Sequence, residues 1–257
     1  MKVAIYILFT FGISIVFGQD EHFNRKKYIN PTIVVDENNI PVDKETFYFP
    51  EQFFPEYKIS HEKIDSTSFL ASSLLIKSKD DSKVEDTFYL YLTPLKGTVN
   101  SIYLEWFSEQ LFALKEPLLF NKETDKEVYR FTWLRTFDNP ISLRIEKSKE
   151  GIRVYSKVGR GLGGYSPKKI KRSKVKKVTI DEWEEFTKLI QVMNFWNSIN
   201  HGSIPASDGA VWILEGSTSD KYTVISKRFV SEGSPMYEVA MFLLHLSGTS
   251  VNKNRIY

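Results

Sequence analysis

The sequence predicts an α+β protein with a mostly antiparallel sheet built from hairpins and two or three helices packed on one face. Apolar and polar residues alternate in several segments that are joined by short polar turns. Other segments repeat their apolar residues at helical spacing. Alternation is typical of half-buried strands, and helical spacing of amphipathic helices. Strands and helices do not follow one another in a regular rhythm, which favours an antiparallel sheet over a parallel one.

The first predicted elements are a strand, a helix and a second strand. Residues 87–95 form an apolar run that ends at a proline and predicts a buried strand. Apolar residues at helical spacing predict a helix over residues 100–115. Aromatic residues then alternate with polar ones over residues 129–137, which predicts a half-buried strand. Arg135 falls on the apolar face of this strand and needs a partner there if it is buried.

Two hairpins are predicted in the second half of the chain. Residues 141–146 and 152–158 alternate on either side of a polar turn, and residues 210–216 and 221–230 do the same.

Two further helices are predicted from their capping residues. Thr179 and Glu182 have the spacing of a capping box, which opens a helix extending to about Trp196. Ser234 precedes a proline at the first position of the last helix, and Gly248 is its expected end.

The N-terminus predicts a secretory signal peptide over residues 1–18. Lys2 precedes an apolar run over residues 3–17, and small Gly18 follows it. A membrane-spanning helix needs about 20 apolar residues, so a retained membrane helix is the alternative that the length disfavours. We therefore expect cleavage after Gly18, export to the periplasm or the medium, and no transmembrane segment in the mature chain.

Composition indicates how such an exported chain is held together. The sequence has 257 residues, no cysteine and a formal net charge of +3. Without disulfides its stability has to come from burial, and without a lipobox cysteine it has no lipid tether. We expect an irregular aromatic arm over residues 19–85 and one α+β domain over residues 86–257. Within the arm, residues 47–57 (FYFPEQFFPEY) can pack across the protein's own domain or form a sugar-stacking surface.

One segment is strongly basic. From Lys168 to Lys177 the sequence KKIKRSKVKK holds seven Lys or Arg residues and no acid. Lysines on an exposed sheet edge commonly block aggregation, which is the structural interpretation. The functional alternative is peripheral contact with anionic lipid headgroups or envelope polysaccharide. Nucleic acid is not an expected partner, because the chain has neither a recognisable motif nor a domain-wide basic excess.

A glycine-rich stretch precedes the basic segment. In residues 160–167 (RGLGGYSP), glycines let the backbone approach another group closely, and Arg160 favours an anion. The P-loop pattern is missing, so a bulged turn at the end of a strand is the structural alternative.

Residues 201–215 contain types that can form a catalytic set, including His201, Ser203 and Ser207, but the nucleophile-elbow motif is absent. Glu215 and Asp208 are the weak catalytic candidates. In the structural alternative, Asp208 begins a strand after a turn, and Glu215 pairs with Arg228 or Arg135. No metal or cofactor is expected, because the histidines are widely spaced and cysteine is absent; they are His22, His61, His201 and His245.

Several of these segments resemble an uncharacterised family of exported, Bacteroidetes-type bacterial proteins with a DGAxWxLEG…Y core. The segments are EVYRFTWLRTFDNPISLRI, GRGLGGYSP, DGAVWILEG and KYTVISKR, within residues 111–246. The resemblance implies a shared fold and export but no reaction.

The leading functional hypothesis is a non-catalytic binding protein of the bacterial envelope or the extracellular space. Its expected ligand is unidentified and anionic, held by arginines and stacked on an aromatic ring. The candidate ligand-binding residues are Arg130, Arg135, Arg160, Tyr165, Trp212 and Arg228. One alternative is a hydrolase that acts on an envelope polymer or ester. The other is an inhibitor or immunity-type protein.

Overall fold

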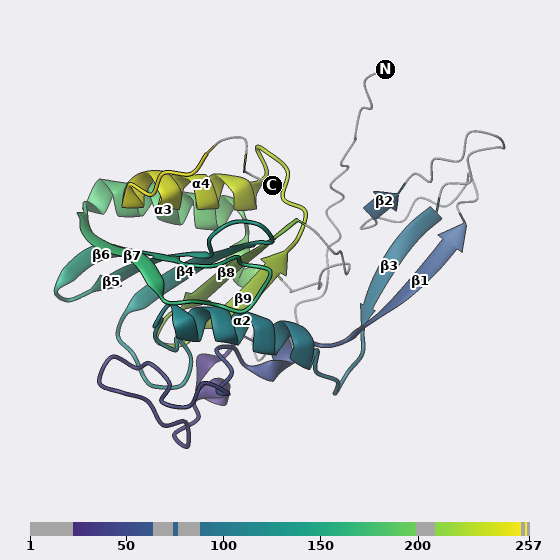
Figure 1. The fold of residues 1–257 in the computed structure, drawn as a ribbon, viewed down its shortest axis with the longest axis horizontal. Helices are drawn as coiled ribbons and strands as arrows, with labels where there is room; N and C mark the ends of the chain where they lie inside the picture. Colours follow the sequence, from purple (N-terminus) through teal and green to yellow (C-terminus); the bar gives the residue numbers. More distant parts are fainter. Residues whose placement is uncertain (1–22, 64–73, 77–87, 199–208, 253–254, 256–257) are drawn as a thin grey trace.

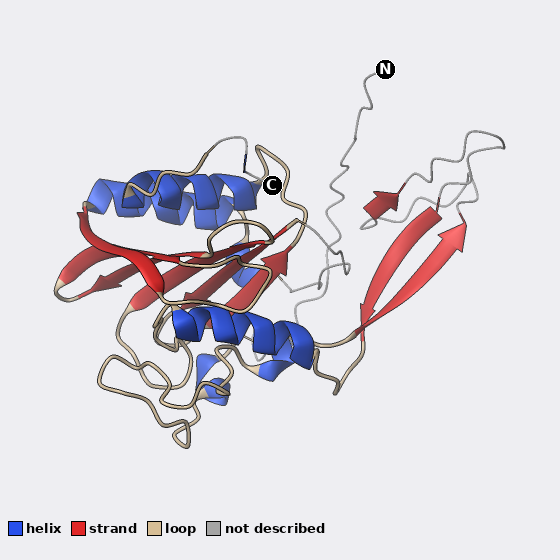
Figure 2. Ribbon diagram, in the orientation of Figure 1, coloured by secondary structure: helices blue, strands red, loops and turns tan. Residues whose placement is uncertain are grey.

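The computed structural model describes residues 23–63, 74–76, 88–198, 209–252 and 255. In this part of the chain a six-stranded sheet forms the centre, and a smaller three-stranded sheet extends from it (Figure 1). The strands in both sheets pair antiparallel, and helices lie on the larger one (Figure 2). The predicted α+β class is therefore confirmed. The predicted signal peptide lies outside the described residues.

The six-stranded sheet contains both predicted hairpins. From edge to edge its strands are β7 (Ile170–Val178), β6 (Gly151–Gly159), β5 (Ile141–Ser148), β4 (Glu127–Arg135), β8 (Ala210–Ser217) and β9 (Tyr222–Lys227). β5 pairs with β6 and β8 with β9, as the alternation predicts. The basic segment becomes β7, an edge strand whose residues 171–177 are all exposed.

The helices begin close to the predicted residues. They are α2 (Ser101–Ala113), α3 (Ile180–Val192) and α4 (Pro235–Ser247). Thr179 and Glu182 form the predicted capping box, and Gly248 ends α4 in the left-handed conformation. The helix predicted to reach Trp196 is shorter, because Asn194 adopts a left-handed conformation with φ 51°. A single 3-10 turn, η3 (Phe195–Asn197), follows it.

One face of the large sheet packs against α3 and α4. Tyr129, Phe131 and Trp133 alternate along β4 and point toward this face. There the ring of Tyr129 contacts Trp183 and Phe186 of α3. These rings belong to a continuous buried cluster that also includes residues of α4. Two helices on one face agree with the predicted layer.

The opposite face is covered by α2 and the N-terminal segment, so β4 is buried on both faces rather than half-buried. The expected aromatic arm supplies part of this cover: η1 (Arg25–Tyr28), η2 (Glu51–Phe53) and the chain around them. Its most buried rings are Tyr48, Phe49, Phe53 and Phe54. These rings are core residues, and they are not available for stacking on a sugar.

The smaller sheet has the order β1 (Tyr57–Lys63), β3 (Phe88–Pro94), β2 (Leu74–Ile76). β3 corresponds to the strand predicted over residues 87–95. It pairs with β1, which precedes the predicted domain boundary at residue 85. In the N-terminal segment, Val35 and Pro41 form an isolated antiparallel bridge. The division into domains itself stays a prediction.

The surroundings of Gly216 in β8 show how closely side chains pack on the sheet face that α3 and α4 cover. A Cβ atom there would lie 2.5 Å from Cε1 of Phe195 and 3.1 Å from the Trp196 ring. We therefore expect Gly216→Ala to lower the free energy of unfolding by about 1–3 kcal/mol, measured by urea denaturation. In a Phe195→Leu background the smaller side chain relieves the clash, so the two changes together should cost less than their sum. Strictly additive effects would contradict the packing described.

Candidate functional site

Charged side chains lie next to one another on the sheet face that α2 covers. The strand register places Tyr155, Arg144, Arg130 and Glu215 in one row across β6, β5, β4 and β8. Arg130 and Glu215 are fully buried, and Arg144 is nearly so. Like charges directly opposite one another on neighbouring strands repel. The two arginines therefore need carboxylates close to both of them.

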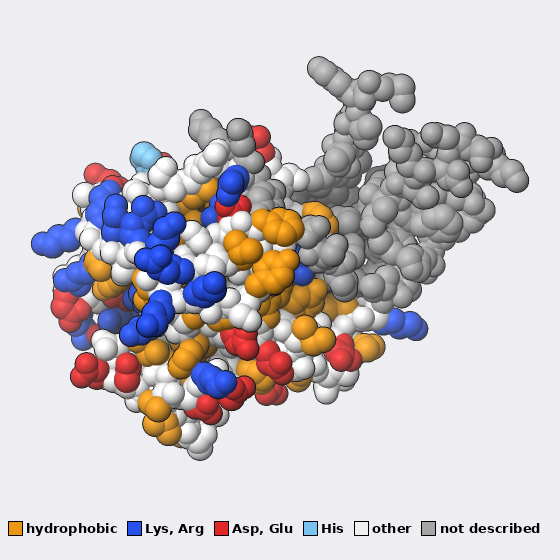
Figure 3. Space-filling view, viewed as in Figure 1, with side chains coloured by type: hydrophobic (Ala, Val, Ile, Leu, Met, Phe, Trp, Pro, Cys, Tyr) orange, Lys and Arg blue, Asp and Glu red, His pale blue; other side chains and the backbone are white. Residues whose placement is uncertain are grey.

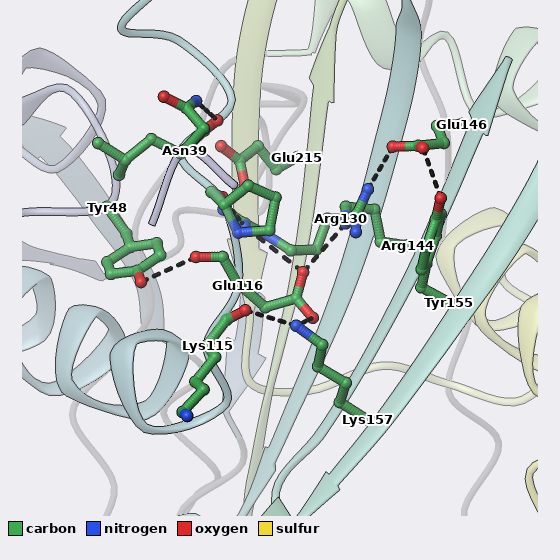
Figure 4. Close-up of polar contacts among 12 residues, drawn as sticks. Asn39, Tyr48, Lys115, Glu116, Arg130, Arg144, Glu146, Tyr155, Lys157 and Glu215 are labelled. Atoms are coloured by element: carbon green, nitrogen blue, oxygen red, sulfur yellow. Dashed lines mark hydrogen bonds and ion pairs between the residues drawn. The ribbon is translucent and has the colours of Figure 1, made fainter. Parts of the chain in front are cut away.

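Glu116 supplies the first carboxylate from the end of α2. Lys115 adopts a left-handed conformation, and the amide of Glu116 donates to the carbonyl of Leu111. This is the hydrogen bond of a Schellman motif, which turns the chain sharply at a helix end. The turn directs the Glu116 side chain into the sheet face, where it is 1% exposed (Figure 4).

The Glu116 carboxylate lies among three cations. Its Oε2 is 3.1 Å from Nε of Arg144 and 4.0 Å from a terminal nitrogen of Arg130. Its Oε1 is 3.2 Å from Nζ of Lys157. Arg130 also donates to the carbonyl of Pro117 at 2.6 Å, so the segment after α2 is bound through both side chain and backbone.

Glu215 and Glu146 complete the charge balance. Glu215 pairs with Arg130 and accepts a hydrogen bond of 2.7 Å from the hydroxyl of Tyr222. Glu146 pairs with Arg144 and accepts one of 2.8 Å from Tyr155. Three carboxylates and three cations thus lie together, and Lys126 at the margin lies 3.7 Å from Glu146. We call this set the charge network: Glu116, Arg130, Arg144, Glu146, Lys157 and Glu215.

The two innermost carboxylates have pKa values that are shifted in opposite directions. Burial raises the pKa of Glu116, but Arg144, Lys157 and Arg130 outweigh it, so its pKa is below the usual value. Burial also raises the pKa of Glu215, and there Arg130 and Tyr222 offset it only in part. Such divergence is typical of acid–base pairs in enzymes. Here, however, both groups are sealed from solvent, and neither is accessible to a substrate.

A second group of charged residues lines a pocket open to solvent at another part of the sheet. The pocket has a volume of about 480 Å³ and lies where β4 and β6 end and β5 and β7 begin. The segment that follows α4 forms another side. The lining residues are Arg135, Asp138, Asn139, Ile141, Val158, Lys171, Arg172, Ser250, Val251, Asn252 and Arg255.

A β-bulge directs two consecutive cations to this pocket. Val158 of β6 faces Arg172, whereas Gly159 faces Ile170, so Lys171 is an extra residue in β7. Bulges change the direction of side chains and are frequent beside functional sites. The bulge lies in β7 and not in residues 160–167, where a bulged turn is one of the predicted alternatives. Its consequence is that Lys171 and Arg172 both line the pocket.

The pocket wall is held in place by hydrogen bonds and one stacking contact. The Arg135 guanidinium lies 4.4 Å from the centroid of the Trp133 ring and donates to the carbonyl of Asn139 at 3.1 Å. Arg255 donates to Asp138 at 2.7 Å, and Lys171 to the side chain of Asn139 at 3.1 Å. Arg135 thus has the partners that its predicted place on the apolar face of β4 requires.

The other predicted site residues do not converge on this pocket. Arg130 and Glu215 belong to the charge network, and Trp212 is buried against Trp133 and Phe131. Arg228 lies over the rings of Tyr103 and Trp106. The expected pairing of Glu215 with Arg228 or Arg135 is wrong, because Arg130 is its direct cross-strand neighbour.

The glycine-rich stretch packs against the protein itself. A Cβ at Gly163 would lie 2.7 Å from the amide nitrogen of Arg135, so only glycine allows this approach. Arg160 and Tyr165 on the same loop are exposed and do not line the pocket. The catalytic candidate Asp208 and residues 201–207 lie outside the described residues.

Sequence reasoning missed most residues of the charge network and several of the pocket. Arg144 and Glu146 alternate with the apolar residues of β5, a pattern that is also typical of a strand with one face in solvent. The available signal was the unusual content of charged residues in β4, β5 and β8, strands that are otherwise apolar. Nothing in the sequence around Glu116 or Arg255 indicated their positions.

Comparisons with known proteins do not assign a family. No protein-family model matches the chain, and no curated protein matches it. Among the described residues, no helix is long and apolar enough to cross a membrane. The same residues contain no cluster of three or more His, Asp or Glu side chains suited to a metal ion.

The charge network predicts a strong effect of Glu116→Gln. Removing this charge leaves Arg130, Arg144 and Lys157 without their shared carboxylate, which should cost about 3–5 kcal/mol in urea denaturation at pH 7. Because the folded-state pKa of Glu116 is lowered, its contribution is present above the usual carboxyl pKa and is lost as the pH falls through the folded-state value. The difference in stability between wild type and variant should therefore shrink in acid.

The matched control is Glu109→Gln, which removes the same charge from an exposed position on α2. It should change the free energy of unfolding by no more than about 0.5 kcal/mol. Similar losses in both variants, or a difference that does not depend on pH, would contradict the role of Glu116.

Proposed function

We propose that this chain is an exported, non-enzymatic binding protein whose pocket beside β7 holds an anionic group of its ligand. The observation that carries the proposal is the composition of the pocket wall: Arg135, Lys171, Arg172 and Arg255 outnumber its one carboxylate, Asp138. Export rests on the predicted signal peptide, and the resemblance to exported bacterial proteins supports it.

The size and shape of the pocket suit a small ligand. Pockets that bind small molecules usually have volumes of about 300–1,000 Å³, and this one has about 480 Å³. Ile141, Val158 and Val251 provide an apolar surface beside the cations. A ligand with one anionic group and an apolar body would match both parts of the wall.

The fixed orientation of Arg135 supports recognition of a carboxylate or phosphate. A guanidinium group binds either anion through two parallel hydrogen bonds when its plane is held in place. The Trp133 ring and the carbonyl of Asn139 hold Arg135 in this way. The hydrolase alternative has no comparable support, because Glu215 is buried and paired with Arg130.

Isothermal titration calorimetry with inorganic phosphate tests this function. Arg172→Gln should weaken phosphate binding about fivefold, because an exposed charged contact contributes about 1 kcal/mol at most. Arg160→Gln is the matched control, since Arg160 is exposed on the neighbouring loop but does not line the pocket. It should leave the affinity unchanged. Absence of binding, or equal losses in both variants, would contradict the proposal.

A further inference from the structure

The pocket is continuous with the basic edge strand β7. Lys171 and Arg172 line the pocket, and Lys174 and Lys176 follow them along the strand. In the register with β6, Arg172 faces Val158, Lys174 faces Ser156 and Lys176 faces Val154. Val154 and Val158 belong to the sheet face that packs against α3 and α4. The three cations therefore lie on that face, as the pocket does.

These cations form a regular series. Alternate residues of an antiparallel strand are about 7 Å apart. Arg172 lies at the pocket, and Lys174 and Lys176 place positive charge at this interval beyond it. All three are exposed, and Lys176 also donates to the carbonyl of Leu246 at 3.2 Å and lies 3.6 Å from Glu182. Lys and Arg side chains gather over β6 and β7 in the view of Figure 3. We call this series the basic track. A single small anion in the pocket would engage Arg172 and leave the rest of the basic track unused.

We infer that the ligand is a linear acidic polysaccharide, with one acidic sugar in the pocket and the next acidic groups along the basic track. The inference rests on the proposed function of the pocket. A polymer with an anion on each repeating unit matches both the pocket and the series of cations. When one polymer makes several weak contacts at once, its overall affinity is well above that of a single unit.

Neutral residues of the pocket favour a sugar over a bare anion. Ser250, Asn252 and Asn139 lie beside the cations. Hydroxyl and amide side chains can bind sugar hydroxyl groups, and the apolar wall at Ile141 and Val251 can contact the sugar ring. The segment that carries Ser250 is fixed to β6, because the hydroxyls of Thr249 and Ser156 lie 2.6 Å apart.

Other polyanions fit the basic track less well. Proteins that bind single-stranded nucleic acid usually stack bases on aromatic rings, and none of the exposed residues 171–177 is aromatic. An anionic membrane attracts lysines through its overall charge, and it does not require a pocket at one end of the series. Both are alternatives that the binding experiment distinguishes.

The test measures how the affinity of the full-length protein for an acidic sugar depends on the number of sugar units. D-galacturonic acid and its linear tetramer are titrated by calorimetry, with the neutral galactose tetramer as a control. The acidic tetramer should bind at least about tenfold more tightly than the monomer, a difference of about 1.4 kcal/mol, and the neutral tetramer should not bind. Equal affinities for monomer and tetramer would overturn the inference. Tighter binding of tripolyphosphate, or of phosphatidylglycerol vesicles, would overturn it as well.

Two variants of β7 test whether the polymer lies along the basic track. Lys174→Gln should weaken tetramer binding about fivefold and leave monomer binding unchanged, because Lys174 lies on the basic track outside the pocket. Lys177→Gln removes the same charge from the other face of the strand and should change neither affinity. Equal losses in both variants would overturn the assignment to this face.

The outcome also separates this inference from the proposed function. If Arg172→Gln weakens phosphate binding but the tetramer binds no more tightly than the monomer, the proposed anion pocket stands and the polysaccharide inference fails. If neither phosphate nor either acidic sugar binds, both proposals fail.

Discussion

Two arginines directly opposite each other on neighbouring strands have to be neutralised before anything can pack over them. Arg130 and Arg144 occupy such positions in the middle of the large sheet, and the Glu116 carboxylate lies close to both of them. Because Glu116 follows α2 directly, the position of that helix and the charge of the sheet are coupled. The N-terminal segment packs over the same face, and Tyr48 donates to the carbonyl of Glu116. Glu116 thus connects both parts of the cover to the sheet, through its carboxylate to the arginines and through its carbonyl to Tyr48.

A buried charge network of this kind does not by itself increase stability. Removing charged groups from water costs several kcal/mol per ion, and replacement by apolar residues is often neutral or stabilising. What the network does here is restrict the packing. Only a segment that brings a carboxylate to the space between Arg130, Arg144 and Lys157 can cover the sheet without leaving a buried charge unbalanced. We interpret the network as a determinant of how α2 and the N-terminal segment are placed.

The same sheet separates structural charges from those that are available to a ligand. The charge network lies on the face under α2, whereas the pocket opens at the end of the sheet on the side of α4. Arg135 and Arg130 belong to one strand, but they differ by an odd number of residues and so point to opposite faces. Arg130 is consequently part of the charge network, and Arg135 is part of the pocket wall.

Local patterns in the sequence predicted most elements, because their determinants are local. Thr179 with Glu182 and Ser234 with Gly248 marked the helix ends, and polar turns marked both hairpins. The sequence did not predict that α2 covers the second face of the sheet. The alternation along β5 is the same whether Arg144 faces water or a buried carboxylate. The pairing of Glu215 depends on which strand lies beside β8, which is a property of the topology. Alternation places Arg135 on the apolar face of its strand, but Arg255 reaches the pocket from a distant part of the chain.

The separation of scaffold and ligand site can be measured directly by NMR of the arginine Nε–Hε groups during titration with inorganic phosphate. Phosphate should shift the signals of Arg135 and Arg172, which line the pocket. The signals of Arg130 and Arg144 should stay unchanged, because these side chains are held by carboxylates of the charge network and do not line the pocket. Shifts confined to Arg130 and Arg144, or no shift at Arg135 and Arg172 at saturating phosphate, would contradict the account.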